Sequence, residues 1–209
     1  MPDTGAAAQI QHAIQDGFAV GDLMTFTAED LSRWTASTPA RDRFHVLLLA
    51  DLSQGISAML TLAGSPTEDW VQRSLAPRAK TLGLAFFLRR ERLCDVVLVD
   101  IREPAQMRDS LRRVPSVVIV APPAGDALAV GVKARVELAD LIARLSPPAV
   151  LVLGNPVLKK ALRGPGGGPG TETAIRCLPT ALGEPGTELR AVLAEGIRLC
   201  AGQDSMKDR

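Results

Sequence analysis

Short, uninterrupted apolar runs alternate along this chain with longer stretches in which apolar residues recur at helical spacing. The runs are rich in Val, Leu and Ile, and they lack the apolar–polar alternation of a half-exposed strand. Such runs are typical of strands buried on both faces of a parallel sheet. The predicted strands are residues 44–50, 82–88, 95–101, 116–121, 149–153 and, with a weaker pattern, 174–178.

The stretches between the runs predict amphipathic helices. In residues 126–145, apolar residues that include Val132 and Val136 recur at a helical period, with charged residues between them. Residues 187–200 show a similar pattern. Strands that alternate with helices indicate an α/β fold. We therefore predict an open, mostly parallel sheet of about five to six strands with helices on both faces, in three layers.

The length of 209 residues suits one sizeable core and is short for two domains. Residues 39–43 have the polar composition of a surface connection. We therefore predict an N-terminal extension (1–43), a single α/β domain (44–200) and a disordered tail (201–209). The glycine- and proline-rich residues 164–170 follow a helix-like stretch and not a strand, so they predict a flexible loop and not a phosphate-binding one.

Composition narrows the classes of function. Lys and Arg (24 residues) nearly balance Asp and Glu (23 residues), so no net field attracts nucleic acid or an anionic membrane. Aromatic residues make up only 3%, which disfavours a base-stacking surface. No stretch approaches the roughly 20 apolar residues that span a bilayer, and the first residues do not resemble a signal peptide. We expect a cytoplasmic protein without an integral membrane segment.

The cysteines and histidines give no sign of a disulfide framework or a zinc site. Cys94, Cys177 and Cys200 are widely spaced and form no C-x-x-C pair. We interpret them as small buried apolar residues. His45 lies inside the first apolar run and is interpreted as a core histidine and not as a catalytic base.

Residues 50–57, directly after the first apolar run, have the spacing of the phosphate-binding loop G-x-x-x-x-G-K-[S/T]. Gly55 and Ser57 fit the second glycine and the hydroxyl position. Ala50 replaces the first glycine, and Ile56 replaces the lysine. That lysine holds the β- and γ-phosphates, which an isoleucine cannot do. The motif is therefore broken.

Three later segments together resemble the second half of the MinD/ParA-type P-loop ATPases. Residues 94–100 end on Asp100, as the Walker B strand of that family ends on an aspartate. Residues 117–123 run into a proline-containing loop, and residues 149–155 end at Asn155, where the family has an asparagine that contacts the base. The similarity implies a fold of that kind.

The resemblance spans roughly residues 90–200 and implies roles for individual residues. Asp100 would be the Walker B carboxylate, Ser57 the hydroxyl that ligates magnesium, and Asn155 the base contact. Ser57 and Asp100 would thus be the metal-binding pair, and a nucleotide with magnesium would be the cofactor. The candidate cofactor-binding residues are Asp51, Ser53, Gly55, Ser57, Asp100 and Asn155.

Simple structural roles are open for the same residues. Asp51 and Asp100 can mark the points where buried strands emerge into water. Ser53 and Ser57 can be helix caps.

The broken loop favours a pseudo-ATPase over an active enzyme. The interval from the loop to Asp100 is also about half of what the family needs for its switch segments. We therefore expect a non-catalytic scaffold or regulatory protein that binds a protein partner or its own copy, and no nucleic acid. Residues 126–145 and the regions of Trp34 and Trp70 could supply the contact surface.

Two alternatives come from other classes. Residues 95–104 are also similar to the phosphoacceptor strand of response-regulator receivers, with Asp100 as acceptor and Asp51 as a magnesium-binding acid. Ala121 would then replace the switch hydroxyl and Asn155 the lysine, so this interpretation ranks second. A Rossmann enzyme such as an S-adenosylmethionine-dependent methyltransferase ranks third, because its first loop requires more than one glycine.

Overall fold

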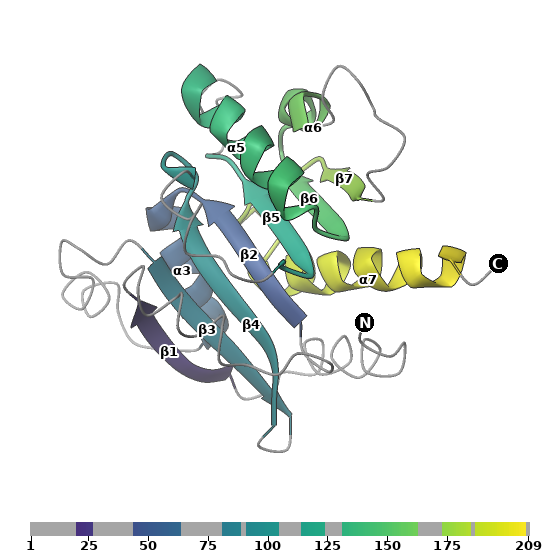
Figure 1. Cartoon of the computed structure of the whole chain (residues 1–209). Helices are drawn as coiled ribbons and strands as arrows, with labels where there is room; N and C mark the ends of the chain where they lie inside the picture. Colours follow the sequence, from purple (N-terminus) through teal and green to yellow (C-terminus); the bar gives the residue numbers. More distant parts are fainter. Residues whose placement is uncertain are drawn as a thin grey trace.

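A seven-stranded sheet forms the centre of the protein (Figure 1). The computed structural model describes residues 20–26, 44–63, 81–88, 91–104, 114–123, 131–162, 173–184 and 187–207. The strands are β1 (Val20–Phe26), β2 (Phe44–Ala50), β3 (Thr81–Leu88), β4 (Glu91–Asp100), β5 (Val117–Ala121), β6 (Ala149–Leu153) and β7 (Ala174–Leu178). The helices are α3 (Leu52–Ala63), α5 (Val132–Leu145), α6 (Pro156–Leu162) and α7 (Leu189–Lys207).

Five strands of the sheet are parallel, in the order β4, β2, β5, β6 and β7. β3 pairs antiparallel with β4, and β1 pairs antiparallel with β3, so these two strands extend the sheet beyond β4. The predicted open, mostly parallel α/β sheet is confirmed. β2 comes first among the parallel strands and lies between β4 and β5, so the chain leaves this point of the sheet in opposite directions. In doubly wound sheets such a switch point is where ligands bind.

One of the predicted parallel strands is antiparallel. The apolar run 82–88 belongs to β3, and only two residues separate β3 from β4. A parallel connection needs a dozen or more residues, so a connection this short can only form a hairpin. The short interval between the two apolar runs in the sequence already indicated a hairpin, whereas the apolar composition of the run 82–88 did not.

The sheet also reaches into the range expected to be an N-terminal extension. β1 belongs to that range and pairs with β3. Its sequence, VGDLMTF, includes Gly, Asp and Thr, so it lacks the continuous apolar pattern of the other strands. At the other end, α7 continues to Lys207, into the range expected to be a tail. The regions of Trp34 and Trp70, the connection 39–43, the glycine-rich loop 164–170 and the beginning of the stretch 126–145 lie outside the described residues.

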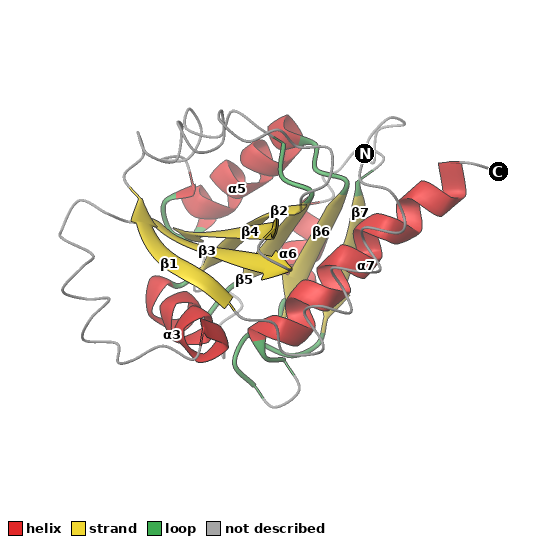
Figure 2. Ribbon diagram, turned by 90° about the horizontal axis from the view of Figure 1, so that it is seen from below, coloured by secondary structure: helices red, strands yellow, loops and turns green. Residues whose placement is uncertain are grey.

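Helices cover both faces of the sheet, as expected for three layers (Figure 2). Side chains of β2 alternate between two buried clusters: Val46 and Leu48 pack with α3 and α7, and Leu47 and Leu49 pack with α5 and α6. This two-sided burial explains why the parallel strands read as continuous apolar runs. None of the helices in the described residues is long and apolar enough to cross a membrane.

Two glycines bring the helices of one face close to the sheet. A Cβ atom at Gly55 of α3 would lie 2.4 Å from Leu98 Cδ1, and one at Gly196 of α7 would lie 2.9 Å from Val117 Cγ1. Both distances are shorter than any normal contact of a Cβ atom. α3 therefore lies so close to β4 at Gly55 that any larger side chain would make the buried Leu98 side chain move.

Candidate functional site

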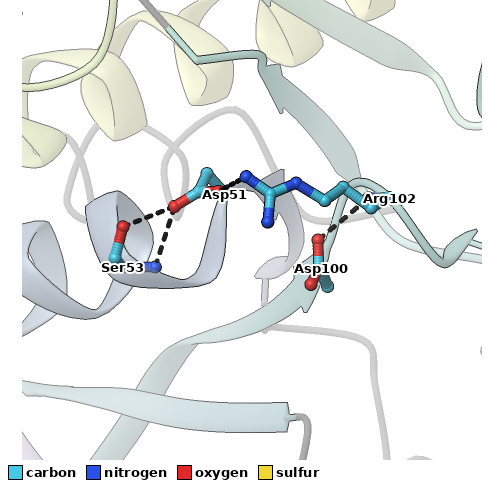
Figure 3. A network of polar contacts seen from close by, with 4 residues as sticks. All are labelled: Asp51, Ser53, Asp100 and Arg102. Carbon is cyan, nitrogen blue, oxygen red and sulfur yellow. Dashed lines mark hydrogen bonds and ion pairs between the residues drawn. The ribbon is translucent and has the colours of Figure 1, made fainter. Parts of the chain in front are cut away.

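Asp51 is the only residue between the end of β2 and the beginning of α3. Its Oδ1 accepts hydrogen bonds from the backbone N–H of Ser53, at 3.1 Å, and from the Ser53 hydroxyl (Figure 3). Its carbonyl oxygen accepts the first helical hydrogen bond, from the N–H of Gly55 at 2.8 Å. Asp51 is thus the N-cap of α3, and the cap is the aspartate and not one of the two serines.

Arg102 completes the environment of Asp51 from the neighbouring strand. β2 and β4 are in register with Ala50 opposite Asp100, so the residues that follow both strands lie at the same edge of the sheet. The Arg102 guanidinium forms an ion pair with Asp51 Oδ2, and the backbone N–H of Arg102 donates a hydrogen bond to Asp100 Oδ1 at 2.9 Å (Figure 3). Asp51, Ser53 and Asp100 are therefore brought together, with Arg102 at the centre of the group.

The carboxyl group of Asp51 is stabilised in its ionised form. The hydrogen bond from the Ser53 hydroxyl is the main reason that its pKa lies below the ordinary value of 3.8. Burial opposes this shift, whereas the charge of Arg102 and backbone N–H groups add to it. The side chain of Asp51 is 12% exposed and that of Arg102 is 61% exposed. The acceptor atoms of Asp51 are thus used within the chain.

The segment with phosphate-loop spacing is the first part of α3 and not a loop. Because the helix begins at Leu52, directly after Asp51, no run of backbone N–H groups is left to wrap around a phosphate. Ile56, at the lysine position, is 7% exposed and belongs to the buried cluster under α3. Ser57 is exposed, and its carbonyl oxygen accepts from the Thr61 hydroxyl at 2.9 Å. The helical spacing of Leu52, Ile56 and Met59 was the sequence signal for α3.

Asn155 lies apart from this group. It follows β6, which is two positions from β2 in the sheet, and it is 2% exposed. Its Oδ1 accepts from the N–H of Leu158 at 2.8 Å, so Asn155 caps α6. Among the described residues, no group of three or more His, Cys, Asp or Glu side chains is placed to hold a metal ion.

A groove of about 870 Å³ lies between α3 and α7. Ala58 and Leu62 of α3 and Leu189 and Ala194 of α7 are among the apolar residues that line it. Gln54 also lines the groove, and its Oε1 is buried without a hydrogen-bond partner in the described part of the chain. Volumes of roughly 300–1,000 Å³ are typical of ligand sites. Sequence reasoning missed this groove because residues 50–57 were interpreted as a loop.

Ion pairs neutralise the α7 side of the groove. Glu195 accepts two hydrogen bonds from Arg198, both at 2.8 Å, and its Oε1 lies 2.5 Å from Arg176 Nη1. The hydrogen bonds from Arg198 are the main reason that the pKa of Glu195 lies below its ordinary value; burial opposes the shift, and the charges of both arginines add to it. The groove thus combines an apolar lining with a rim of paired charges.

His45 and Cys94 have core environments, as the sequence predicted. His45 Nδ1 lies 3.5 Å from Oδ2 of the fully buried Asp95, which is its register partner on β4. Burial, and then the charge of Asp95, raises the pKa of the Cys94 thiol well above its ordinary value. This thiol is therefore neutral and unreactive at physiological pH. All three cysteines are free; Cys200 is buried as predicted, whereas the prediction is wrong for Cys177, which is half-buried.

Comparison of the chain with models of protein families and with curated protein sequences gives no match. Function therefore has to be argued from the geometry of the molecule itself. The relevant features are the capped edge of the sheet and the surfaces of the helices.

Proposed function

We propose that this protein is a non-catalytic α/β domain that acts by binding another protein. One observation carries the proposal: α3 begins one residue after β2, with Ile56 buried where a P-loop ATPase has its lysine. Phosphate binding needs both an exposed cation and a loop of N–H groups. A scaffold or regulatory role on a degenerate P-loop-like fold needs neither.

The polar residues at the edge of the sheet support the same proposal. Asp51 caps α3 and pairs with Arg102, Asp100 accepts from the backbone of Arg102, and Asn155 caps α6. Each of these contacts stabilises the fold, so a ligand would have to displace it. A buried acceptor that loses its hydrogen-bond donor costs about 1–3 kcal/mol. A nucleotide that displaced these contacts would bind more weakly by that amount.

The test is the thermal unfolding midpoint of the purified protein with and without millimolar ATP or ADP and magnesium. A ligand at 100 times its dissociation constant raises the free energy of unfolding by about 2.7 kcal/mol, which shifts the midpoint by several degrees. We expect no shift. A magnesium-dependent shift that is lost in both Ser57→Ala and Asp100→Ala would overturn the proposal, as would ATP hydrolysis lost in Asp100→Ala.

The same preparation separates the two alternatives. A receiver-like domain would take up phosphate at Asp100 from a small phosphodonor, and Asp100→Asn would abolish the uptake. A Rossmann methyltransferase would be stabilised by S-adenosylmethionine. We expect neither result.

A further inference from the structure

Helix α5 has a second apolar side that points away from the sheet. Its buried side consists of Ala134, Leu138, Leu141, Ile142 and Leu145. Val132 and Val136, which the sequence pattern placed in the same apolar face, are instead 68% and 62% exposed. Val114 and Val157 are exposed as well, at 56% and 57%, but each lies singly, whereas Val132 and Val136 lie one helical turn apart on the same helix.

The exposed valines belong to a longer stripe with a spacing of four, three and four residues. We define the outer seam of α5 as Val132, Val136, Ala139 and Ala143. Ala143 is exposed, whereas Ala139 is half-buried and also packs against the buried cluster between α5 and the sheet, so it marks the margin of the seam. This spacing places all four residues along one line of the helix and is the spacing by which helices pair in coiled coils. The stripe therefore fits another helix and not a small molecule.

The charged residues beside the outer seam indicate which partner helix fits it. Lys133 and Asp140 each follow a seam residue directly, so they lie on the same flank, and Lys133 Nζ also lies 3.7 Å from Glu137 Oε1 of its own helix. When two copies of α5 pair antiparallel, the corresponding flanks of the two helices face each other, and Lys133 of one copy lies opposite Asp140 of the other. Twofold symmetry makes this ion pair twice. The seam is thus complementary in charge to itself.

The sizes of the seam residues agree with the antiparallel arrangement. In that arrangement Val132 faces Ala143 of the other copy, and Val136 faces Ala139, so each layer combines one large and one small side chain. A parallel pair would place valine on valine at one end and alanine on alanine at the other. Even layers keep the two helix axes at a constant distance, which close packing requires.

We propose that the outer seam of α5 is the interface of an antiparallel homodimer. This inference rests on the proposed function, since it names a second copy of this chain as the partner. A helix of 14 residues is about 21 Å long, so the interface is small and the dimer is weak, with a dissociation constant on the order of micromolar.

Sedimentation velocity of the full chain over a range from low to high micromolar concentration tests the interface. We expect a reversible monomer–dimer equilibrium, with a dissociation constant that Val136→Asp raises at least about tenfold. Val114→Asp is the matched control, because Val114 is 56% exposed but precedes β5 and is not part of α5. It should leave the dissociation constant unchanged. A monomer at all concentrations, or equal effects of both variants, would overturn the proposal.

Charge exchange tests the orientation without touching the apolar residues. Lys133→Glu and Asp140→Lys should each weaken the homodimer about tenfold, because each places like charges opposite one another twice. The double variant should regain the wild-type affinity. The two single variants, when mixed, should form a heterodimer that is tighter than either homodimer. Additive weakening in the double variant would exclude the antiparallel pairing.

A disulfide gives an independent readout of the geometry. Positions 132 and 143 are about 16 Å apart along one helix, so a bond between them can form only between two copies. Val132→Cys/Ala143→Cys should give a covalent dimer on mild oxidation, whereas Val132→Cys alone should give much less. Failure of the homodimer while nucleotide still does not bind would refute this interface and leave the proposed function standing. Magnesium-dependent nucleotide binding would instead refute the proposed function, whatever the state of association.

Discussion

The edge of the sheet around Asp51 and the outer seam of α5 differ in what the fold does with their side chains. At the edge, the polar side chains form hydrogen bonds and ion pairs within the chain: Asp51 and Asn155 cap helices, and Arg102 pairs with Asp51. On α5, apolar groups are left in water although the helix already has a complete buried side. In the sequence, the first region resembles a nucleotide site, whereas the second is part of a stretch, residues 126–145, that the sequence suggests as a contact surface for a protein.

The comparison teaches where a function should be sought in this molecule. A polar residue at a strand end is uninformative when a cap or an ion pair accounts for it. An exposed apolar residue on a well-packed helix has no such internal explanation. Four substitutions can break or sharpen this contrast.

Ile56→Lys should have the largest effect on stability. The substitution restores the lysine of the motif but places a charge in the cluster under α3, where Ile56 is 7% exposed. We expect a loss of about 3 kcal/mol or more in the free energy of unfolding, measured by chemical denaturation. Ser57→Lys is the matched control on the exposed side of the helix and should change stability by less than about 0.5 kcal/mol. If Ile56→Lys is stable and binds ATP, the edge is a nucleotide site after all.

Gly55→Val should have the next largest effect, about 2–3 kcal/mol, because the new side chain would overlap Leu98. This glycine would then serve the packing of α3 and not the approach of a phosphate. A denaturation cycle with Leu98→Ala checks the reason: the double variant should lose clearly less than the sum of the two single losses. Strictly additive losses of stability would mean that the side chains at positions 55 and 98 do not contact each other.

Asp51→Asn should have a smaller effect, less than about 1 kcal/mol at pH 7, since asparagine also caps helices and Arg102 is mostly exposed. The pKa of Asp51 is lowered in the folded state, so its charge stabilises the fold above the ordinary aspartate pKa of about 4. This contribution is lost as the pH falls through the lower folded pKa. The difference in stability between wild type and Asp51→Asn should therefore vanish on acidification. A difference that grows at low pH would contradict the assignment.

Val136→Ser should have the smallest effect on stability. Measured at concentrations where the monomer dominates, the free energy of unfolding should change by less than about 0.5 kcal/mol, because Val136 is 62% exposed and outside the buried side of α5. A loss above about 1 kcal/mol would show that Val136 is part of the monomer core. Val136 and Ile56 would then both be core positions, and the difference between the two regions would not hold.

Much of the fold could be predicted because its strands are buried on both faces. The runs 44–50, 149–153 and 174–178 coincide with β2, β6 and β7. β1 was missed since polar residues interrupt its sequence.

The candidate site was harder to predict than the fold. A motif with one glycine and no lysine cannot be distinguished by spacing from a helix that begins with an aspartate cap. The ion pair between Arg102 and Asp51 joins residues 51 positions apart, so no local pattern reveals it. The outer seam of α5 was visible as periodicity, but the sequence could not tell which of two apolar stripes faces the sheet.

The hairpin of β3 and β4 also has a consequence for how the chain folds. Its strands are joined by two residues, so it can form within about 1–10 microseconds, long before distant segments meet. β2 ends at Ala50, but the two strands that pair with it begin much later in the chain, β4 at Glu91 and β5 at Val117. Closing these long loops is entropically unfavourable, which slows the step. We expect the hairpin to be the early template on which the centre of the sheet is later assembled.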